Sequence, residues 1–291
     1  MKIIIVTGRS RSIGNFYDEI IIPLKGFLKD NNIIFSTIDF ADKIQKDNNS
    51  NNLYIGIFHH VDINKMPRNY IMLAMDPLDN CNDTMMLKIK NASKVLIYKK
   101  DMMNLNKTSI YYPFPYHEAL ENIYNIDDNY KRNLLGKYNI DLLIVGAIND
   151  KRRQIYDMLL GKYKIYCPNI NEHPMGLYEK DRDILLHSTK ITILNNYYKN
   201  DIQGPRIVYN ASNKIFFIYV LNDDDDENLL DDMYDNLIIK CNKSNLYETI
   251  NYYLKNENER LENVNKLYDY IKTKHHITNF LDLNSIIGTT S

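Results

Sequence analysis

The chain has 291 residues, 44% of them hydrophobic, and a formal net charge of −1. This length fits one large domain or two of ordinary size, and the neutral balance lacks the basic excess that marks a nucleic-acid-binding protein. The three cysteines, Cys81, Cys167 and Cys241, predict neither a disulfide framework nor a metal site, which indicates a reducing compartment. Residues 215–221, the longest apolar run, are a third of the length needed to cross a bilayer, so we expect no transmembrane segment.

The front half of the chain predicts alternating strands and helices. Short β-branched or aromatic runs that end in polar residues predict strands, and apolar residues at helical spacing predict helices. The expected strands are residues 2–6, 33–38, 53–58, 69–75, 94–98 and 109–112, and the expected helices are residues 16–28 and 83–90. Two prolines, Pro113 and Pro115, then interrupt regular structure.

A polar segment, residues 122–139, is expected to link an N-terminal domain (residues 1–121) to a second domain (residues 140–274), with residues 275–291 as a tail. The strands expected in the second domain are residues 140–145, 163–166, 191–194, 215–220 and 237–240, and the helices are residues 152–160, 180–187, a segment after Pro205, and residues 243–274. Strands that alternate with helices predict an α/β fold, with parallel sheets covered by helices on both faces.

A β-branched strand that ends in glycine occurs twice, about half a chain apart. One leads from the N-terminus to Gly8 and the other leads from Asp141 to Gly146, and a helical pattern follows each. Nucleotide-binding α/β units usually open in this way. We therefore expect two Rossmann-like domains with a cleft between them.

Four ordered segments of the back half, together with one in the front half, carry a family resemblance. Residues 145–153 form a strand, a glycine and a basic helix start; residues 179–191 read Glu-Lys-Asp-Arg followed by Ser-Thr-Lys-Ile. Residues 204–218 place an arginine at a helix start before a core strand, and residues 235–240 form a short strand before a helix. This set resembles the nucleotide-binding domain of GT-B glycosyltransferases of the group 1 class, in particular the small bacterial and viral enzymes. Residues 66–76 are similar to a Pro-Lys-x-Tyr-Ile strand of that group.

The resemblance implies transfer of a sugar from a UDP- or GDP-linked donor, with no metal and no other cofactor. The leaving diphosphate gains negative charge, which arginine, lysine and helix N-termini can stabilise. Arg206 is the expected catalytic group for this role. The expected phosphate-binding residues are Gly146, Asn149, Arg152, Arg153 and Lys190. An ordinary solvated helix turn is the alternative interpretation of the basic cluster at residues 151–153.

Tyr209 and Asn210 stand where most GT-B enzymes carry a glutamate that holds the ribose of the donor. They are therefore the expected ribose-binding residues. The missing carboxylate also leaves open a catalytically inactive GT-B scaffold.

In the front half, polar residues follow the expected strands at the ends where α/β sheets bind ligands. Gly8 and Ser10 belong to the first such loop. His60, or alternatively Asp76, would deprotonate the acceptor if the reaction inverts the sugar, because a histidine titrates near neutral pH. The resemblance leaves the acceptor open among a glycan, a protein and a small molecule, and it implies a cytoplasmic location, in the host if the source is a virus.

A short-chain dehydrogenase that uses NAD(P) is the second enzyme class to consider. Residues 7–14 nearly match its Thr-Gly-x-x-x-Gly-Ile-Gly loop, and Tyr268 and Lys272 have its Tyr-x-x-x-Lys spacing. That spacing falls near the C-terminus on an expected helix, and a lone glycine loop is a weak signal.

Overall fold

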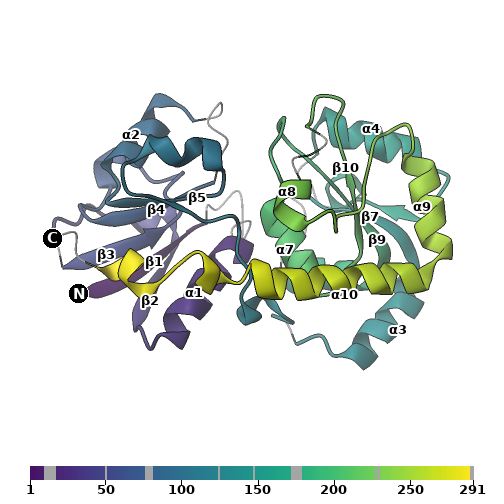
Figure 1. Cartoon of the computed structure of the whole chain (residues 1–291), viewed down its shortest axis with the longest axis horizontal. Helices are drawn as coiled ribbons and strands as arrows, with labels where there is room; N and C mark the ends of the chain where they lie inside the picture. The colour runs from purple at the N-terminus through teal and green to yellow at the C-terminus, as the bar shows by residue number, and fades with distance from the viewer. Residues whose placement is uncertain are drawn as a thin grey trace. The chain divides into compact units, whose positions relative to one another are not determined.

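The computed structural model describes residues 1–9, 18–49, 51–75, 81–123, 125–146, 148–171, 179–226, 228 and 230–288. In these residues the strands form two separate sheets, all of whose pairings are parallel, and helices connect them (Figure 1). The expected α/β class is confirmed. The chain divides into two compact units: unit 1 comprises residues 1–119 and 274–291, and unit 2 comprises residues 120–273.

Unit 1 contains a six-stranded sheet in the order β2-β1-β3-β4-β5-β6. Its strands are β1 (Lys2–Arg9), β2 (Phe35–Phe40), β3 (Asn52–Gly56), β4 (Tyr70–Ala74), β5 (Lys94–Ile97) and β6 (Ser109–Tyr111). Its α-helices are α1 (Asp18–Asp30), α2 (Asp83–Asn91) and α11 (Leu283–Ile287), and its short 3₁₀ helices include η2 (Ile63–Lys65) and η6 (Ile277–Asn279). All five residues of β4 are buried, as expected for a parallel strand that helices cover on both faces.

Unit 2 contains a five-stranded sheet in the order β11-β10-β9-β7-β8. Its strands are β7 (Ile140–Ile144), β8 (Ile165–Tyr166), β9 (Thr189–Asn195), β10 (Phe217–Val220) and β11 (Lys240–Cys241). Its helices are α3 (Asp128–Tyr138), α4 (Asp150–Leu159), α5 (Pro168–Asn171), α6 (Glu179–Ser188), α7 (Gly204–Ser212), α8 (Asp231–Tyr234), α9 (Leu246–Lys255) and α10 (Glu257–Lys274). Apolar residues of β7, β9 and β10 pack with α4, α9 and α10 in one core.

In each sheet, the order in which strands are added reverses at the strand that comes first in the chain within that sheet. The second strand in chain order lies on one side of the first, and the later strands lie on the other, so β1 stands between β2 and β3, and β7 stands between β8 and β9. At such a switch point the connections leave a crevice outside the carboxyl ends of the strands, where α/β sheets bind their ligands. The carboxyl ends of β7 and β9 are therefore the place in unit 2 where a site is expected.

The expected linker, residues 122–139, is part of unit 2. Most of it is helix α3, which packs on α6 and buries Leu134. The sequence of this segment is mostly polar, so the apolar spacing that predicts a helix was not evident.

The expected tail, residues 275–291, is part of unit 1 rather than a free end. The amide of Tyr116 donates to the carbonyl of His275, and the amide of Ile277 donates back to Tyr116. Ile277, Leu281 and Ile286 are buried. In the part of the chain that the structure describes, no helix combines the length and apolar character needed to cross a membrane.

Candidate functional site

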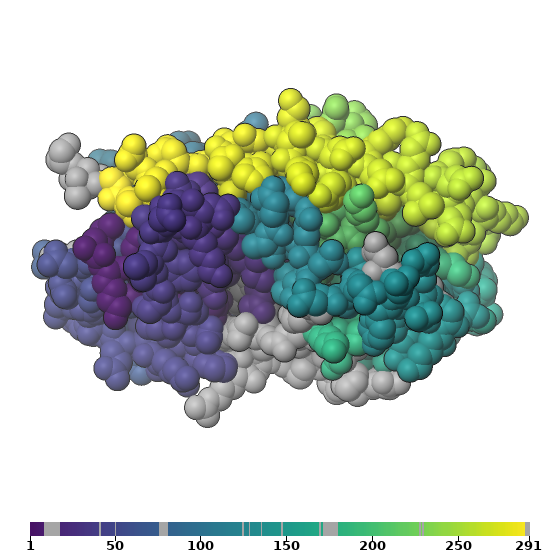
Figure 2. All heavy atoms as spheres, turned by 90° about the horizontal axis from the view of Figure 1, so that it is seen from below, coloured from purple at the N-terminus to yellow at the C-terminus, as the bar shows by residue number. Residues whose placement is uncertain are grey.

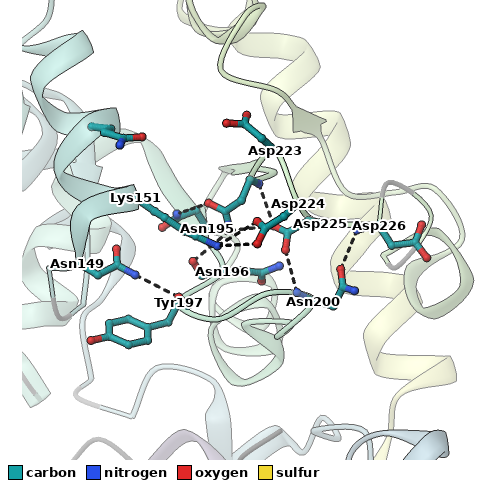
Figure 3. A network of polar contacts seen from close by, with 12 residues as sticks. Asn149, Lys151, Asn195, Asn196, Tyr197, Asn200, Asp223, Asp224, Asp225 and Asp226 are labelled. Atoms are coloured by element: carbon teal, nitrogen blue, oxygen red, sulfur yellow. Dashed lines mark hydrogen bonds and ion pairs between the residues drawn. The ribbon is translucent and has the colours of Figure 1, made fainter. Parts of the chain in front are cut away.

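The second glycine turn folds as a strand, a glycine and a capped helix. Gly146 follows β7 with φ of +115°, a region that glycine adopts most easily. Asn149 caps α4: its Oδ1 accepts from the amide of Arg152 at 2.9 Å, and its Nδ2 donates to the carbonyl of Tyr197 at 3.2 Å (Figure 3). This second bond ties the start of α4 to the loop after β9.

Arg152 points from the first turn of α4 into the interior, where its side chain is buried. Its Nε donates to Oδ1 of Asn195 at 2.9 Å, and its Nη2 donates to the Asn195 carbonyl at 3.1 Å. Both acceptors are neutral. Burial, and then the nearby positive charge of Arg206, lower the pKa of Arg152 to about 9. A negatively charged ligand beside a buried arginine with a lowered pKa would stabilise the charged form of its guanidinium.

Arg206 reaches the same glycine from another helix. It lies in the first turn of α7, after Pro205, and its Nη1 donates to the carbonyl of Val145 at 2.6 Å. A Cβ atom built on Gly146 would lie 2.3 Å from Nη1 of Arg206 and 2.8 Å from Nη1 of Arg152. Two guanidinium groups therefore meet at Gly146, at the switch point of the sheet.

This arrangement is suited to an anion with several oxygens. Each guanidinium presents N–H donors in a plane, and arginine commonly binds phosphate through two parallel hydrogen bonds. The N-termini of α4 and α7 add their positive ends to the same edge. Gly146 and Arg206 are half-buried, so part of the site is accessible to solvent while Arg152 is not.

The other basic residues of the cluster face outward. Arg153 is exposed, and Lys151 forms an ion pair with Asp224 at 3.0 Å (Figure 3). Only Arg152 of this cluster is buried beside Gly146, so the solvated-turn interpretation fits its exposed neighbour Arg153.

Three predicted residues do not lie with the arginine pair. Lys190 stands near the start of β9, at the opposite edge of the sheet, and its Nζ pairs with Asp141 at 2.6 Å. Tyr209 and Asn210 are buried in α7, and the hydroxyl of Tyr209 donates to the carboxylate of Asp183. In this structure the Tyr209 side chain is buried and hydrogen-bonded within the protein, so it is not accessible to a ribose.

A group of buried asparagines next to the arginine pair was not predicted from the sequence. Asn195, Asn196 and Asn222 are all buried where β9 and β10 end. Asn195 Nδ2 donates to Asn222 at 3.3 Å, and the hydroxyl of Tyr219 donates to Asn196. The signal was available, because asparagines directly after two apolar strand patterns predict polar groups at the carboxyl edge.

In unit 1, Gly8 lies at the carboxyl edge of the sheet with φ of +71°. His60 is exposed in the turn after β3, and the buried Lys88 holds this turn by donating to the carbonyls of Phe58 and His59, each at 3.0 Å. Burial lowers the pKa of Lys88. The remaining predicted residues of this half, Ser10 and Asp76, lie outside the described residues.

The dehydrogenase pair belongs to α10 of unit 2, whereas the Gly8 loop belongs to unit 1. Lys272 donates to the hydroxyl of Tyr268 at 3.1 Å, and that hydroxyl donates to Glu121 at 2.7 Å. In the residues that the structure describes, no group of three or more histidine, cysteine or acidic side chains could hold a metal ion.

Comparisons with protein-family models, with curated proteins and with solved structures found no match.

Proposed function

We propose that this protein is a glycosyltransferase that takes its sugar from a UDP- or GDP-linked donor, with the donor diphosphate held by unit 2. The observation that carries the proposal is the meeting of Arg152 and Arg206 at Gly146, at the switch point of a parallel sheet. The resemblance of residues 145–153 and 204–218 to the GT-B donor domain supports the same assignment.

The proposed roles follow from charge and exposure. As the bond between sugar and diphosphate breaks, negative charge builds up on the leaving oxygens. A hydrogen-bond donor that the protein already holds in position stabilises that charge without reorganisation. The half-buried Arg206 would contact these oxygens directly. The buried Arg152, fixed by Asn195, would supply the second positive charge from beneath.

The two sheets would then act as two Rossmann-like halves, with the acceptor bound mainly by unit 1. His60, or Asp76, would serve as the base of an inverting reaction. The acceptor would be a glycan, a protein or a small molecule, and no further cofactor is needed for this chemistry.

The first test is isothermal titration calorimetry of the full chain with UDP and GDP. Arg206→Met should raise the Kd at least tenfold, because a hydrogen bond to a charged group contributes about 1.5–3 kcal/mol. Arg132→Met, at an exposed arginine of α3, is the matched control and should leave the Kd unchanged.

The second test measures release of UDP or GDP from a panel of nucleotide sugars, with and without candidate acceptors. Release that Arg206→Met abolishes would support transfer. Tight nucleotide binding without release would identify an inactive GT-B scaffold, and no binding of either nucleotide at millimolar concentration would overturn the proposal. A binding response to NAD(P) alone would favour the dehydrogenase.

A further inference from the structure

A pocket of unit 2 lies at the amino edge of the sheet, opposite the arginine pair. Its volume is about 680 Å³, within the range of small-molecule sites. It is lined by α3, by the end of α6, by the starts of β7 and β9, by the end of α7 and by α10. Figure 2 shows α3 in teal and α10 in yellow bordering a hollow in which the green end of α7 is visible. The strands that begin here, β7 and β9, end at the proposed diphosphate site.

Part of the pocket wall is apolar. Leu186, Ile215, Phe216 and Val264 line it and are buried. The deepest polar groups bond within the protein: the hydroxyl of Ser188 donates to Leu185, and Ser212 and Asn213 donate to carbonyls of α7. These walls therefore favour an apolar body, since their polar groups are already satisfied.

The lining also carries an excess of positive charge. The cationic lining residues are Lys131, Lys190, Lys214 and Arg260, of which Lys190 is paired with Asp141, and the acidic lining residues are Glu121 and Glu257. Burial lowers the pKa of Arg260, which Glu257 partly offsets. Positive charge beside an apolar wall favours an occupant with one anionic end.

Lys214 has a backbone conformation that lysine seldom adopts. Its φ is +52°, and it occupies the left-handed position of a Schellman motif that ends α7, where its amide donates to Ala211 and the amide of Ile215 donates to Asn210. Glycine avoids the steric cost of this conformation. The lysine at this position holds its ammonium over the Tyr268 ring, 4.7 Å from the ring centroid, so its charge lies at the pocket.

We propose that this pocket binds an organic anion with an extended apolar body, of the chemical class of a fatty-acid carboxylate, and that Lys214 contributes to holding its charged group. This site is separate from the diphosphate site, and it does not depend on the proposed glycosyltransferase activity.

The test is isothermal titration calorimetry of the full chain with sodium decanoate and, as a probe of opposite charge, decyltrimethylammonium. Decanoate should bind and the cation should not. Leu261→Trp, at a half-exposed lining residue, should fill the pocket and raise the decanoate Kd at least fivefold.

Lys214→Gly should weaken decanoate binding to a similar extent while shifting urea-induced unfolding to higher urea, because the backbone strain is removed. Lys214→Arg, which keeps the charge, should retain binding.

Lys137→Ala, at an exposed lysine of α3 outside the lining, is the location control and should not change the Kd. Absence of decanoate binding, equal binding of the cation, or a Leu261→Trp variant with unaltered affinity would each overturn the proposal. Arg206→Met should leave decanoate binding intact, so failure at this pocket and failure at the diphosphate site are distinguishable.

Discussion

The two glycine turns occupy equivalent places in their sheets but have different surroundings. A Cβ atom on Gly8 would lie 2.7 Å from the Cβ and Cγ2 atoms of Ile57, whereas a Cβ atom on Gly146 would meet two guanidinium groups. In unit 1 the glycine lets two neighbouring chain segments pack closely, and in unit 2 it leaves room for a pair of cations. A strand that ends in glycine therefore marks a position in the fold, and different side chains reach that position in the two units: an isoleucine in unit 1 and two arginines in unit 2.

Alanine at each glycine should have the largest effect and should separate the two roles. Gly8→Ala places a methyl group against Ile57, including its backbone oxygen at 3.0 Å, and should lower the free energy of unfolding by about 2–4 kcal/mol. Gly146→Ala should also lower the free energy of unfolding, because alanine is strained at φ of +115°, and in addition it should weaken UDP or GDP binding at least tenfold because its methyl group displaces the two guanidinium groups. Urea denaturation and calorimetry of both variants check this. Equal loss of nucleotide binding in the two variants would contradict the comparison.

Arg152→Met should separate ligand binding from stability within unit 2. A buried cation is costly to desolvate, and a methionine of similar length removes that cost while it leaves Asn195 without two of its hydrogen-bond donors. We expect the free energy of unfolding to change by less than about 1 kcal/mol and nucleotide affinity to fall at least tenfold. A large loss of stability with retained affinity would show that Arg152 is a structural residue.

The lowered pKa of Arg152 gives the site a pH dependence. Nucleotide affinity should fall, by up to about tenfold, as the pH rises through about 9, because the folded protein then loses the charge. The effect on stability has the opposite sign. The unfolded chain holds this proton to a much higher pH, so the contribution of Arg152 to the free energy of unfolding rises as the pH increases above about 9. Calorimetry of the protein and of Arg152→Met on either side of pH 9 measures the first effect, because the uracil and guanine bases of the ligands also titrate near this pH, and an equal fall in affinity in the variant would contradict it.

The smallest effect is expected at the outer charges. Asp224→Asn removes an ion pair with Lys151 that is partly exposed on both sides. Exposed pairs contribute about 0–1 kcal/mol, so stability should change little and nucleotide affinity should not change. A clear gain in affinity would show that Asp224 competes with the ligand for positive charge, and the site would then have to include Lys151.

Much of the fold follows from local pattern. Nearly continuous apolar runs such as residues 215–221 predicted core strands, whereas the helix expected from residue 152 begins at Asp150, where Asn149 caps it. The second expected strand shows the limit of this reasoning. It begins later than predicted, at Phe35, because Asn32 adopts φ of +59° and turns the chain at the end of α1.

Strand direction predicts which of the candidate residues lie at the carboxyl edge of the sheet. Arg152 and Arg206 both start helices that follow carboxyl ends of strands, and the structure brings them together. Lys190 precedes its apolar run, so strand direction alone places it at the far edge. The helix register that turns Tyr209 inward, toward Asp183, depends on tertiary packing, which no local pattern contains.

Residues 274–288 belong to unit 1 although they follow unit 2 in the sequence, and this affects the order in which the newly made chain can fold. Protein synthesis proceeds from the N-terminus, and domains generally fold as they emerge. Unit 2 is continuous, so all of it is synthesised before the segment that carries Ile277, Leu281 and Ile286. The half that is synthesised first is thus completed last, and until then the surface that buries these three side chains remains uncovered.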